Sequence, residues 1–447
     1  MSKTLRLTPF ERCMMFEHCA AYPCYCFIRL HFDGRLDRSS LTIAMHAALQ
    51  HHPLLRAIIK TGWGKRWSFP DDTEPSIIWR EGTTGGPLPP AADIDLFREP
   101  GLKTFVVRDN TKTELTLQFH HACCDGNGIA RFIEDVMVNY ARVCENGPGC
   151  DHPPTVDVSS LATRGAYGLR FWSTLKILPG QLVGLLGAIQ FWGRKPKSVI
   201  AHQARSRDQS SPSPYPSLAA FRFDKANTLA LRKAAIEQNV SLNELLIRDF
   251  FLALWKWQQD HDQYNDQHWI RLMIPIDMRN KSYRSLPAMN QVSSIFLDRR
   301  GSDRTDRDQL LRSIRDEMAV IRKFQLRYTF LFFINALHRI PTALRKSVQR
   351  DECKTSAIFS CVRKALWRDS LPRQDGFVRV GDTTIVDIDG LAPIRPHNCL
   401  TMLTVKYAHR LKLNLHYDAD FVTPAQADEL MHLFVSNLNE TAHPSDP

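Results

Sequence analysis

The chain has 447 residues, of which 43% are hydrophobic and 23% are charged, the ordinary balance of a globular protein with a large core. Its 58 Lys and Arg residues exceed its 47 Asp and Glu residues and give a net charge of +11. This excess favours phosphate-bearing cofactors, acidic carrier proteins or membrane surfaces as partners. The basic residues are scattered and show no aromatic-basic pattern of a known module, so we expect no nucleic-acid partner.

Cysteines and the N-terminal residues indicate where the protein works. The eleven cysteines have no metal-ligand spacing, so we expect free thiols in a reducing cytoplasm and no bound metal. The first residues lack the apolar stretch of a signal peptide. We therefore expect a cytoplasmic protein, and a monomer.

One apolar segment, from Leu175 to Trp192, stands out from the rest of the sequence. Lys176, Pro179 and several glycines interrupt it, and it falls short of the ~20 apolar residues that a spanning helix needs. We interpret it as a helix that caps the domain before the chain crosses over. A helix on a membrane surface, with peripheral contact through 175–197, and a wall of an acyl tunnel are the alternatives.

The predicted elements in the first half mix strands and helices. Hydrophobic patterning predicts strands at 24–32, 55–61, 65–69, 104–107 and 114–119, a helix at 38–50 and a Gly- and Pro-rich loop at 85–90. A polar, proline-bearing stretch at 204–217 is the best linker in the chain. It divides an N-terminal half, 1–203, from a C-terminal half, 218–447.

The second half repeats this mixture without repeating the sequence. We predict strands at 220–223 and 270–275, a helix at 227–237, a long helix at 307–336 with a break near 325–328, and a hairpin of strands 402–407 and 412–417. Ser241 and Thr423 are predicted N-caps of further helices, each with Glu or Gln three residues on. The mixture predicts an α/β (α+β) protein of two sandwiches with mixed sheets.

The most informative motif is the sequence from His120 to Gly126, His-His-Ala-Cys-Cys-Asp-Gly. Strand 114–119 alternates polar and apolar residues, as a half-buried strand does. A period of two then puts His121 on the apolar face and His120 on the other. Apolar residues at helical spacing follow the motif, which therefore predicts a strand-to-helix turn with a histidine at its edge. Such a histidine suits a general base.

This motif resembles the His-His-x-x-x-Asp-Gly signature of the coenzyme A-dependent acyltransferase superfamily. Three further segments agree in order: Asp33-Gly34 followed by His52-Pro53-Leu54-Leu55-Arg56, then Pro275 to Arg279 with Asn290 downstream, and a closing hairpin and helix after 411. The resemblance is nearest to condensation-like and alcohol acetyltransferase-like members. It implies two chloramphenicol acetyltransferase-like subdomains in a V-shaped pseudo-dimer, with the site at their interface.

The resemblance also implies roles for individual residues. His121 is the general base of the catalytic group His121, His120 and Asp125, in which His120 supports the loop. Asp125 points away from the cleft and pairs with Arg279, while Gly126 allows the tight turn. Asn290 and Ser360 are the substrate-binding candidates.

The implied reaction is transfer of an acyl group from a thioester to a small alcohol or amine. No cofactor is bound, and acyl-CoA or an acyl carrier protein is the co-substrate. We favour acyl-CoA because no carrier or adenylation module is attached to the given sequence. A condensation-type enzyme with a carrier-bound donor, a non-catalytic carrier-binding scaffold and a metal hydrolase stay as alternatives. Two structural histidines, or a nucleophilic Cys123 or Cys124, are the remaining readings of the motif.

Overall fold

The computed structural model describes all residues except 1–3, 63, 71–72, 148–155, 201–214, 281–285, 305, 363–365, 367, 369 and 444–447. Its strands are β1 Thr4–Arg6, β2 Tyr25–Asp33, β3 Ile58–Lys60, β4 Arg66–Ser68, β5 Ile77–Glu81, β6 Leu102–Arg108, β7 Lys112–His120, β8 Leu218–Arg222, β9 Trp269–Asp277, β10 Val292–Arg300, β11 Ala357–Val362, β12 Arg373–Gln374, β13 Phe377–Val380, β14 Thr383–Leu391, β15 Leu400–Tyr407 and β16 Arg410–Tyr417. Its helices are α1 Pro9–Glu17, α2 Arg38–His51, α3 Gly126–Asn146, α4 Phe171–Gly193, α5 Lys225–Glu237, α6 Leu242–Asp260, α7 Arg307–Lys323, α8 Thr329–Arg339, α9 Ala343–Val348 and α10 Pro424–Ala442.

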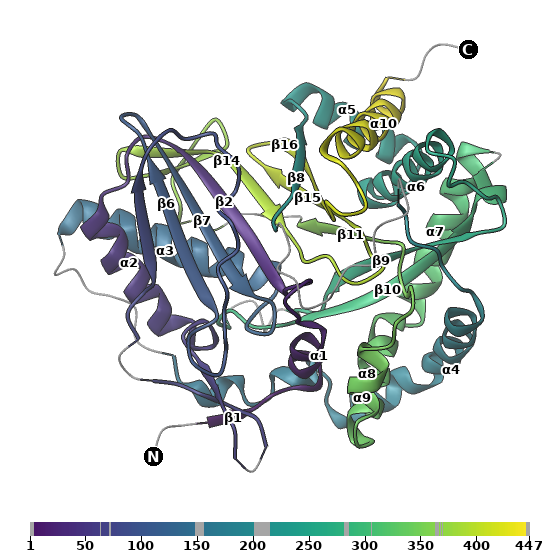
Figure 1. Ribbon diagram of the computed structural model, residues 1–447, viewed down its shortest axis with the longest axis horizontal. Helices are drawn as coiled ribbons and strands as arrows, with labels where there is room; N and C mark the ends of the chain where they lie inside the picture. The colour runs from purple at the N-terminus through teal and green to yellow at the C-terminus, as the bar shows by residue number, and fades with distance from the viewer. Residues whose placement is uncertain are drawn as a thin grey trace.

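Two large sheets stand side by side and carry helices on their outer faces (Figure 1). The first has the strand order β12-β13-β14-β2-β7-β6-β5, and the second has the order β10-β9-β11-β15-β16-β8. Both sheets are mixed, because β5 runs parallel to β6, and β11 runs parallel to β9 and to β15. The predicted two-sandwich α/β fold is confirmed.

A strand from late in the chain completes the first sheet. β14 pairs antiparallel with β2, from Thr384 opposite Asp33 to Leu391 opposite Phe27. β12 and β13 follow it outward, and Val378, Ile385 and Ile388 lie in the first hydrophobic core. The halves are therefore joined by exchanged structure as well as by the predicted linker 204–217, most of which lies outside the described residues.

Several predicted helix boundaries follow from local chemistry. Ser241 and Thr423 each form the predicted capping box, with Glu244 and Gln426 at the third helical position. The predicted long helix breaks between α7 and α8, where Gln325 has a φ of 54°. A residue in this left-handed region cannot continue an α-helix.

The face pattern of β7 differs from the sequence-based expectation. We expected a half-buried strand, but every residue of β7 except Lys112 is buried. The loop that follows β5 covers the polar face, where Gln118 accepts a hydrogen bond from the main-chain N–H of Ala92 (2.9 Å). Buried polar side chains with partners of this kind satisfy their hydrogen bonds without solvent.

The segment 175–192, interpreted as a helix that caps the domain, is helical but largely exposed. This segment lies within α4, where Gly184 is the only buried residue of the helix. By length and composition alone, Val158–Gly193 qualifies as a candidate membrane span, with a mean hydropathy of 1.2 in its best window. Burial in the protein therefore does not explain why this segment is apolar.

Candidate functional site

The histidine motif forms the turn between β7 and α3. His120 ends the strand and is 1% exposed, and its Nδ1 accepts a hydrogen bond from the N–H of Ala122 (3.1 Å). Its ring stacks on that of His18, with 4.9 Å between centroids. Burial lowers the pKa of His120 well below its ordinary value, and the nearby His18 and His121 act in the same direction. The hydrogen bond from Ala122 and the stacking on His18 tie His120 to the turn.

The backbone of His121 is held from both halves of the molecule. Its N–H donates to the carbonyl of Cys24 beside β2 (2.9 Å), and its carbonyl accepts from Nδ2 of Asn290 (2.8 Å). The same amide nitrogen also donates to the carbonyl of Ala122 (3.0 Å). His121 lies in the turn rather than in β7, so the turn and not the period of the strand directs its side chain.

Asn290 contacts the turn, whereas the sequence suggested a contact with substrate. Its side chain is 3% exposed, and its Nδ2 is occupied by the carbonyls of His121 and Ala122. These contacts make Asn290 a positioning residue for the histidine. A role of Asn290 in substrate binding stays a prediction.

The electrostatic surroundings of His121 keep its ring neutral. Burial lowers the pKa of His121, and its own main-chain carbonyl and the carboxylate of Asp125 oppose this effect. Arg395 lowers the pKa further and Glu17 raises it. In the part of the chain that the structure describes, Nδ1 of His121 has no hydrogen-bond partner. A neutral imidazole is the form that accepts a proton.

Asp125 is the residue that fixes the turn. Its Oδ1 accepts from the N–H of Gly128 (2.8 Å) and caps α3, and its Oδ2 accepts from the N–H of Gln291 (2.7 Å). Arg279 adds two contacts, Nη2 to Oδ1 (2.8 Å) and Nη1 to Oδ2 (3.1 Å). The predicted Asp125–Arg279 pair is present. Four contacts on one buried carboxylate leave it no freedom to orient the ring of His121.

The glycine that the turn requires is Gly128, not Gly126. A Cβ at Gly126 would meet its nearest neighbour, Cγ2 of Val362, at 3.7 Å, an ordinary contact, so the expectation that the tight turn needs glycine at this position is wrong. A Cβ at Gly128 would lie 3.0 Å from both Cβ of Cys124 and the carbonyl of Met289. The absent side chain thus lets the segment from the second half approach the start of α3.

Ser360 lies on the strand of the second sheet that runs toward the motif. It is partly exposed on β11, and its neighbour Phe359 is buried in the second core. Alternation along the strand puts Ser360 on the same face as Val362, the residue nearest to Gly126. The structure therefore brings Ser360 to the side of the motif. Its contact with substrate stays a prediction.

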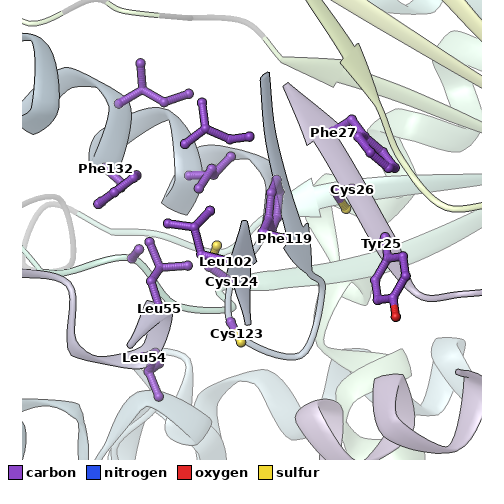
Figure 2. Packing of buried hydrophobic residues seen from close by; sticks show 14 of the residues in the cluster. Tyr25, Cys26, Phe27, Leu54, Leu55, Leu102, Phe119, Cys123, Cys124 and Phe132 are labelled. Atoms are coloured by element: carbon purple, nitrogen blue, oxygen red, sulfur yellow. The ribbon is translucent and has the colours of Figure 1, made fainter. Parts of the chain in front are cut away.

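Cys123 and Cys124 are packing residues. Both are fully buried members of the first hydrophobic core, part of which Figure 2 shows. Burial raises the pKa of each thiol above its ordinary value. Since the thiolate is the nucleophilic form, a buried thiol of this kind is unreactive.

A cavity of about 440 Å³ lies beside the motif, between α1, α4, α8 and the loop after β14. Glu17 and Arg395, which form an ion pair (2.8 Å), belong to its wall, as does His18. His121 is not among the lining residues. Glu17 and Arg395 are nonetheless the charges that act on His121 from this side. Sequence reasoning missed all three residues, because no local pattern marks them.

A second histidine pair lies outside this site. His51, His52 and Asp135 place one ligand atom each within 4.8 Å of one another. However, Nδ1 of His52 accepts from the N–H of Ala288 (2.8 Å), so its Nε2 carries the proton that faces Asp135 (2.9 Å). Both ring nitrogens of His52 are thus used in hydrogen bonds, and this cluster gives no support to a metal-hydrolase function.

Comparison with known proteins adds relatives by sequence. No protein-family model matches the chain. An uncharacterised protein of Mycobacterium tuberculosis is 23% identical over 316 residues, which cover 68% of this chain and 69% of that protein. A phthiocerol/phthiodiolone dimycocerosyl transferase of Mycobacterium bovis is 22% identical over 270 residues, which cover 58% of this chain and 60% of the transferase.

Solved structures match nearly the whole chain. The first condensation domain of the calcium-dependent antibiotic synthetase gives a TM-score of 0.71 at 15% identity, over 99% of this chain and 97% of that domain. Polyketide synthase associated protein 5 from Mycobacterium tuberculosis gives 0.64 at 17% identity, over 98% of both chains. The chain thus has the two-sheet pseudo-dimer fold of condensation domains, and its sequence relatives include a transferase, both consistent with the coenzyme A-dependent acyltransferase superfamily.

Proposed function

We propose that this protein is an acyltransferase that moves an acyl group from a thioester to an alcohol or amine, with His121 as general base. The observation that carries the proposal is the position of His121, whose backbone is held by Cys24 from one side and Asn290 from the other. Burial, which lowers the pKa of His121, favours the neutral ring that a base requires. The fold and the named transferase among the relatives support the same reaction class.

The proposed reaction moves one proton from the acceptor to His121 and then from His121 to the leaving sulfur. The imidazole of His121 accepts the proton of the acceptor O–H or N–H while the acceptor attacks the thioester carbonyl. The tetrahedral intermediate then breaks its C–S bond, and the imidazolium returns the proton to the leaving sulfur. No covalent enzyme intermediate forms. Asp125 and Arg279 act only by holding the turn that carries the ring.

The donor is a thioester of coenzyme A or of a carrier protein. The net charge of +11 complements the phosphates of one and the acidic surface of the other. The printed names of the relatives, a dimycocerosyl transferase and a polyketide synthase associated protein, favour a lipid or polyketide acyl group. A condensation-type reaction with a carrier-bound donor is the second candidate, because condensation domains share the fold over nearly the whole chain.

The test is thiol release by the purified protein from acyl-CoA or from an acylated carrier protein, with a panel of alcohols and amines. Acceptor-dependent release that falls about 10²–10⁴-fold in His121→Ala supports the proposal. His120→Ala serves as the structural comparison and reduces activity less while lowering the melting temperature more.

The choice of acyl donor distinguishes the two candidate functions. Release from acyl-CoA identifies a free-standing acyltransferase, and release only from the carrier identifies the condensation-type enzyme. Unchanged turnover in a folded His121→Ala variant would overturn the assignment of the base. Tight carrier binding without release from either donor would identify a scaffold instead of an enzyme.

A further inference from the structure

The outer side of α4 is a stripe of large apolar side chains that no described part of the protein covers. Its members recur every three or four residues, the spacing of one helix face, and are between 42% and 70% exposed. Monomeric soluble proteins rarely leave so continuous an apolar surface in water. We call this surface the outward stripe: Phe171, Leu175, Leu178, Leu182, Leu185, Ile189 and Trp192.

The opposite side of α4 attaches the helix to the protein. A Cβ at Gly180 would lie 2.5 Å from the carbonyl of Phe324, and one at Gly184 would lie 2.6 Å from Oγ1 of Thr329. Gln181 accepts a hydrogen bond from the Thr329 hydroxyl (2.8 Å). This close, polar contact fixes the orientation of the helix. Because this side of α4 packs against the protein, the outward stripe faces solvent.

Basic residues accompany the stripe. The sequence from 158 to 200 contains six Arg or Lys residues and no Asp or Glu. Arg170 stands at the start of α4, Lys176 lies on its first turns and Lys195 and Lys197 follow its end, all of them exposed. An anionic membrane surface attracts Lys and Arg side chains that lie close to it. Trp172 and Trp192 lie near the two ends, and Trp favours the boundary between lipid and water.

We propose that α4 docks this protein on an anionic membrane surface, lying in the plane of the interface with the outward stripe among the acyl chains. An apolar face flanked by Lys and Arg is the chemistry of an interfacial helix. The helix does not span the bilayer, because Gly180, Gln181 and Gly184 hold one side of it against the protein. Figure 1 shows α4 at the periphery of the molecule beside α8 and α9.

A second copy of the chain fits this surface less well. A twofold axis allows two packed stripes to run parallel or antiparallel. Lys195 and Lys197 of one copy would face the same two residues of the other in the parallel arrangement, or Arg170 and Lys176 in the antiparallel one, so like charges meet in both. The same cations attract an anionic lipid surface.

The docking surface adjoins the cavities of the protein. A cavity of about 200 Å³ lies between α4, α8 and β10. It shares five lining residues with the cavity that reaches Glu17 and His18, namely Phe191, Trp192, Phe296, Phe330 and Phe333. The aromatic wall that the two cavities share suits an acyl chain better than a polar protein partner.

The proposal is tested by sedimentation of the full chain with vesicles of phosphatidylcholine alone or with about 30% phosphatidylglycerol. Wild type is expected to bind the anionic vesicles, less at high salt. The double variant Leu182→Glu/Ile189→Glu, at positions 67% and 69% exposed, is expected to bind at least about 10-fold less. The matched control Leu229→Glu/Ile236→Glu changes 61% and 75% exposed residues of α5 and is expected to bind like wild type.

Further variants and measurements distinguish membrane docking from the alternatives. Lys195→Glu/Lys197→Glu is expected to weaken binding to anionic vesicles only. A single Leu182→Glu variant replaces the double variant if circular dichroism shows that the latter is unfolded. Equal binding of the stripe variant and wild type, or no binding by wild type, overturns the proposal. Retention of the protein in the membrane after an alkaline wash would indicate a spanning helix. A dimer of the wild type that the stripe variant does not form would indicate that a second copy of the chain covers the stripe. Either result overturns the proposal. None of these readouts requires catalysis.

Discussion

Arg279 holds Asp125 across 154 residues of sequence through two side-by-side contacts, Nη2 to Oδ1 at 2.8 Å and Nη1 to Oδ2 at 3.1 Å. Both side chains are nearly inaccessible, 9% and 6% exposed. One residue follows β9 in the second half and the other caps α3 in the first. The ion pair therefore links the second half directly to the histidine turn.

The pair makes a prediction about stability. Asp125→Ala or Arg279→Ala is expected to lower the free energy of unfolding by about 3–5 kcal/mol, because each breaks a buried ion pair. In Asp125→Ala the guanidinium of Arg279 keeps only the half-exposed carboxylate of Asp277 (3.0 Å) as a charged partner. The double variant is expected to lose less than the sum, since no unpaired charge remains. Urea denaturation measures the cycle. Lys233 and Glu237, an exposed pair on α5, form the control cycle, with an expected coupling of about 0–1 kcal/mol. Additive losses at Asp125 and Arg279 would show that they do not interact in solution.

The two glycines of the motif helix are expected to respond in opposite ways. Gly128→Ala puts a methyl group 3.0 Å from Cβ of Cys124 and from the carbonyl of Met289, so it is expected to lower stability by about 1–3 kcal/mol. Gly126→Ala meets nothing closer than 3.7 Å and is expected to change stability by less than about 0.5 kcal/mol. Thermal denaturation of both variants checks this. Equal losses would mean that the approach of the second half does not depend on Gly128.

The sequence was sufficient for features that rest on local chemistry. Strand β7, its turn and α3 follow from hydrophobic period, and the helix breaks and caps follow from single residues such as Ser241 and Thr423. The Asp125–Arg279 pair was predicted because a family motif carried both residues. The motif gave the histidine but not the charges around it.

Features that depend on distant contacts were not predictable in this way. Glu17 and Arg395 meet only when α1 packs against the loop after β14, and nothing in either local sequence marks the meeting. The burial of both faces of β7 depends on a loop that covers it. The requirement for glycine at position 128 depends on Met289, which packs against the start of α3 from the second half and leaves no mark in the local sequence.

A buried charge cluster between the sheets predicts a pH dependence of stability. His31 on β2 lies between Asp389 of β14 (2.7 Å) and Glu114 of β7 (3.1 Å), with Arg29 and Lys412 also on these carboxylates. Burial disfavours the charged ring, but the hydrogen bonds to Asp389 and Glu114 outweigh it and raise the pKa of His31. The stabilisation is thus complete below the unfolded pKa, near 6.5, and is lost as the pH rises through the folded pKa.

The measurement is the free energy of unfolding between about pH 5 and pH 9 for wild type and His31→Gln. Wild type is expected to have the higher free energy of unfolding at the acid end, and this difference from the variant is expected to shrink as the pH rises through the range. His432→Gln, which changes an exposed histidine of α10, is the control and is expected to keep the wild-type slope. A constant difference between wild type and His31→Gln would show that His31 does not titrate between its two carboxylates.

The electrostatics of His121 predict the pH profile of the proposed reaction. Because burial lowers the pKa of His121 below its ordinary value of 6.5, the acid limb of kcat/KM is expected below that pH. Glu17→Gln removes a charge that raises this pKa and is expected to move the limb further down. Arg395→Met removes a charge that lowers it and is expected to move the limb up. Glu352→Gln is the matched control, because Glu352 lines the same cavity as Glu17 and Arg395. It is expected to leave the acid limb of kcat/KM unchanged. If the limb stayed fixed in both Glu17→Gln and Arg395→Met, the titrating group would not be His121, and another residue would have to be the base.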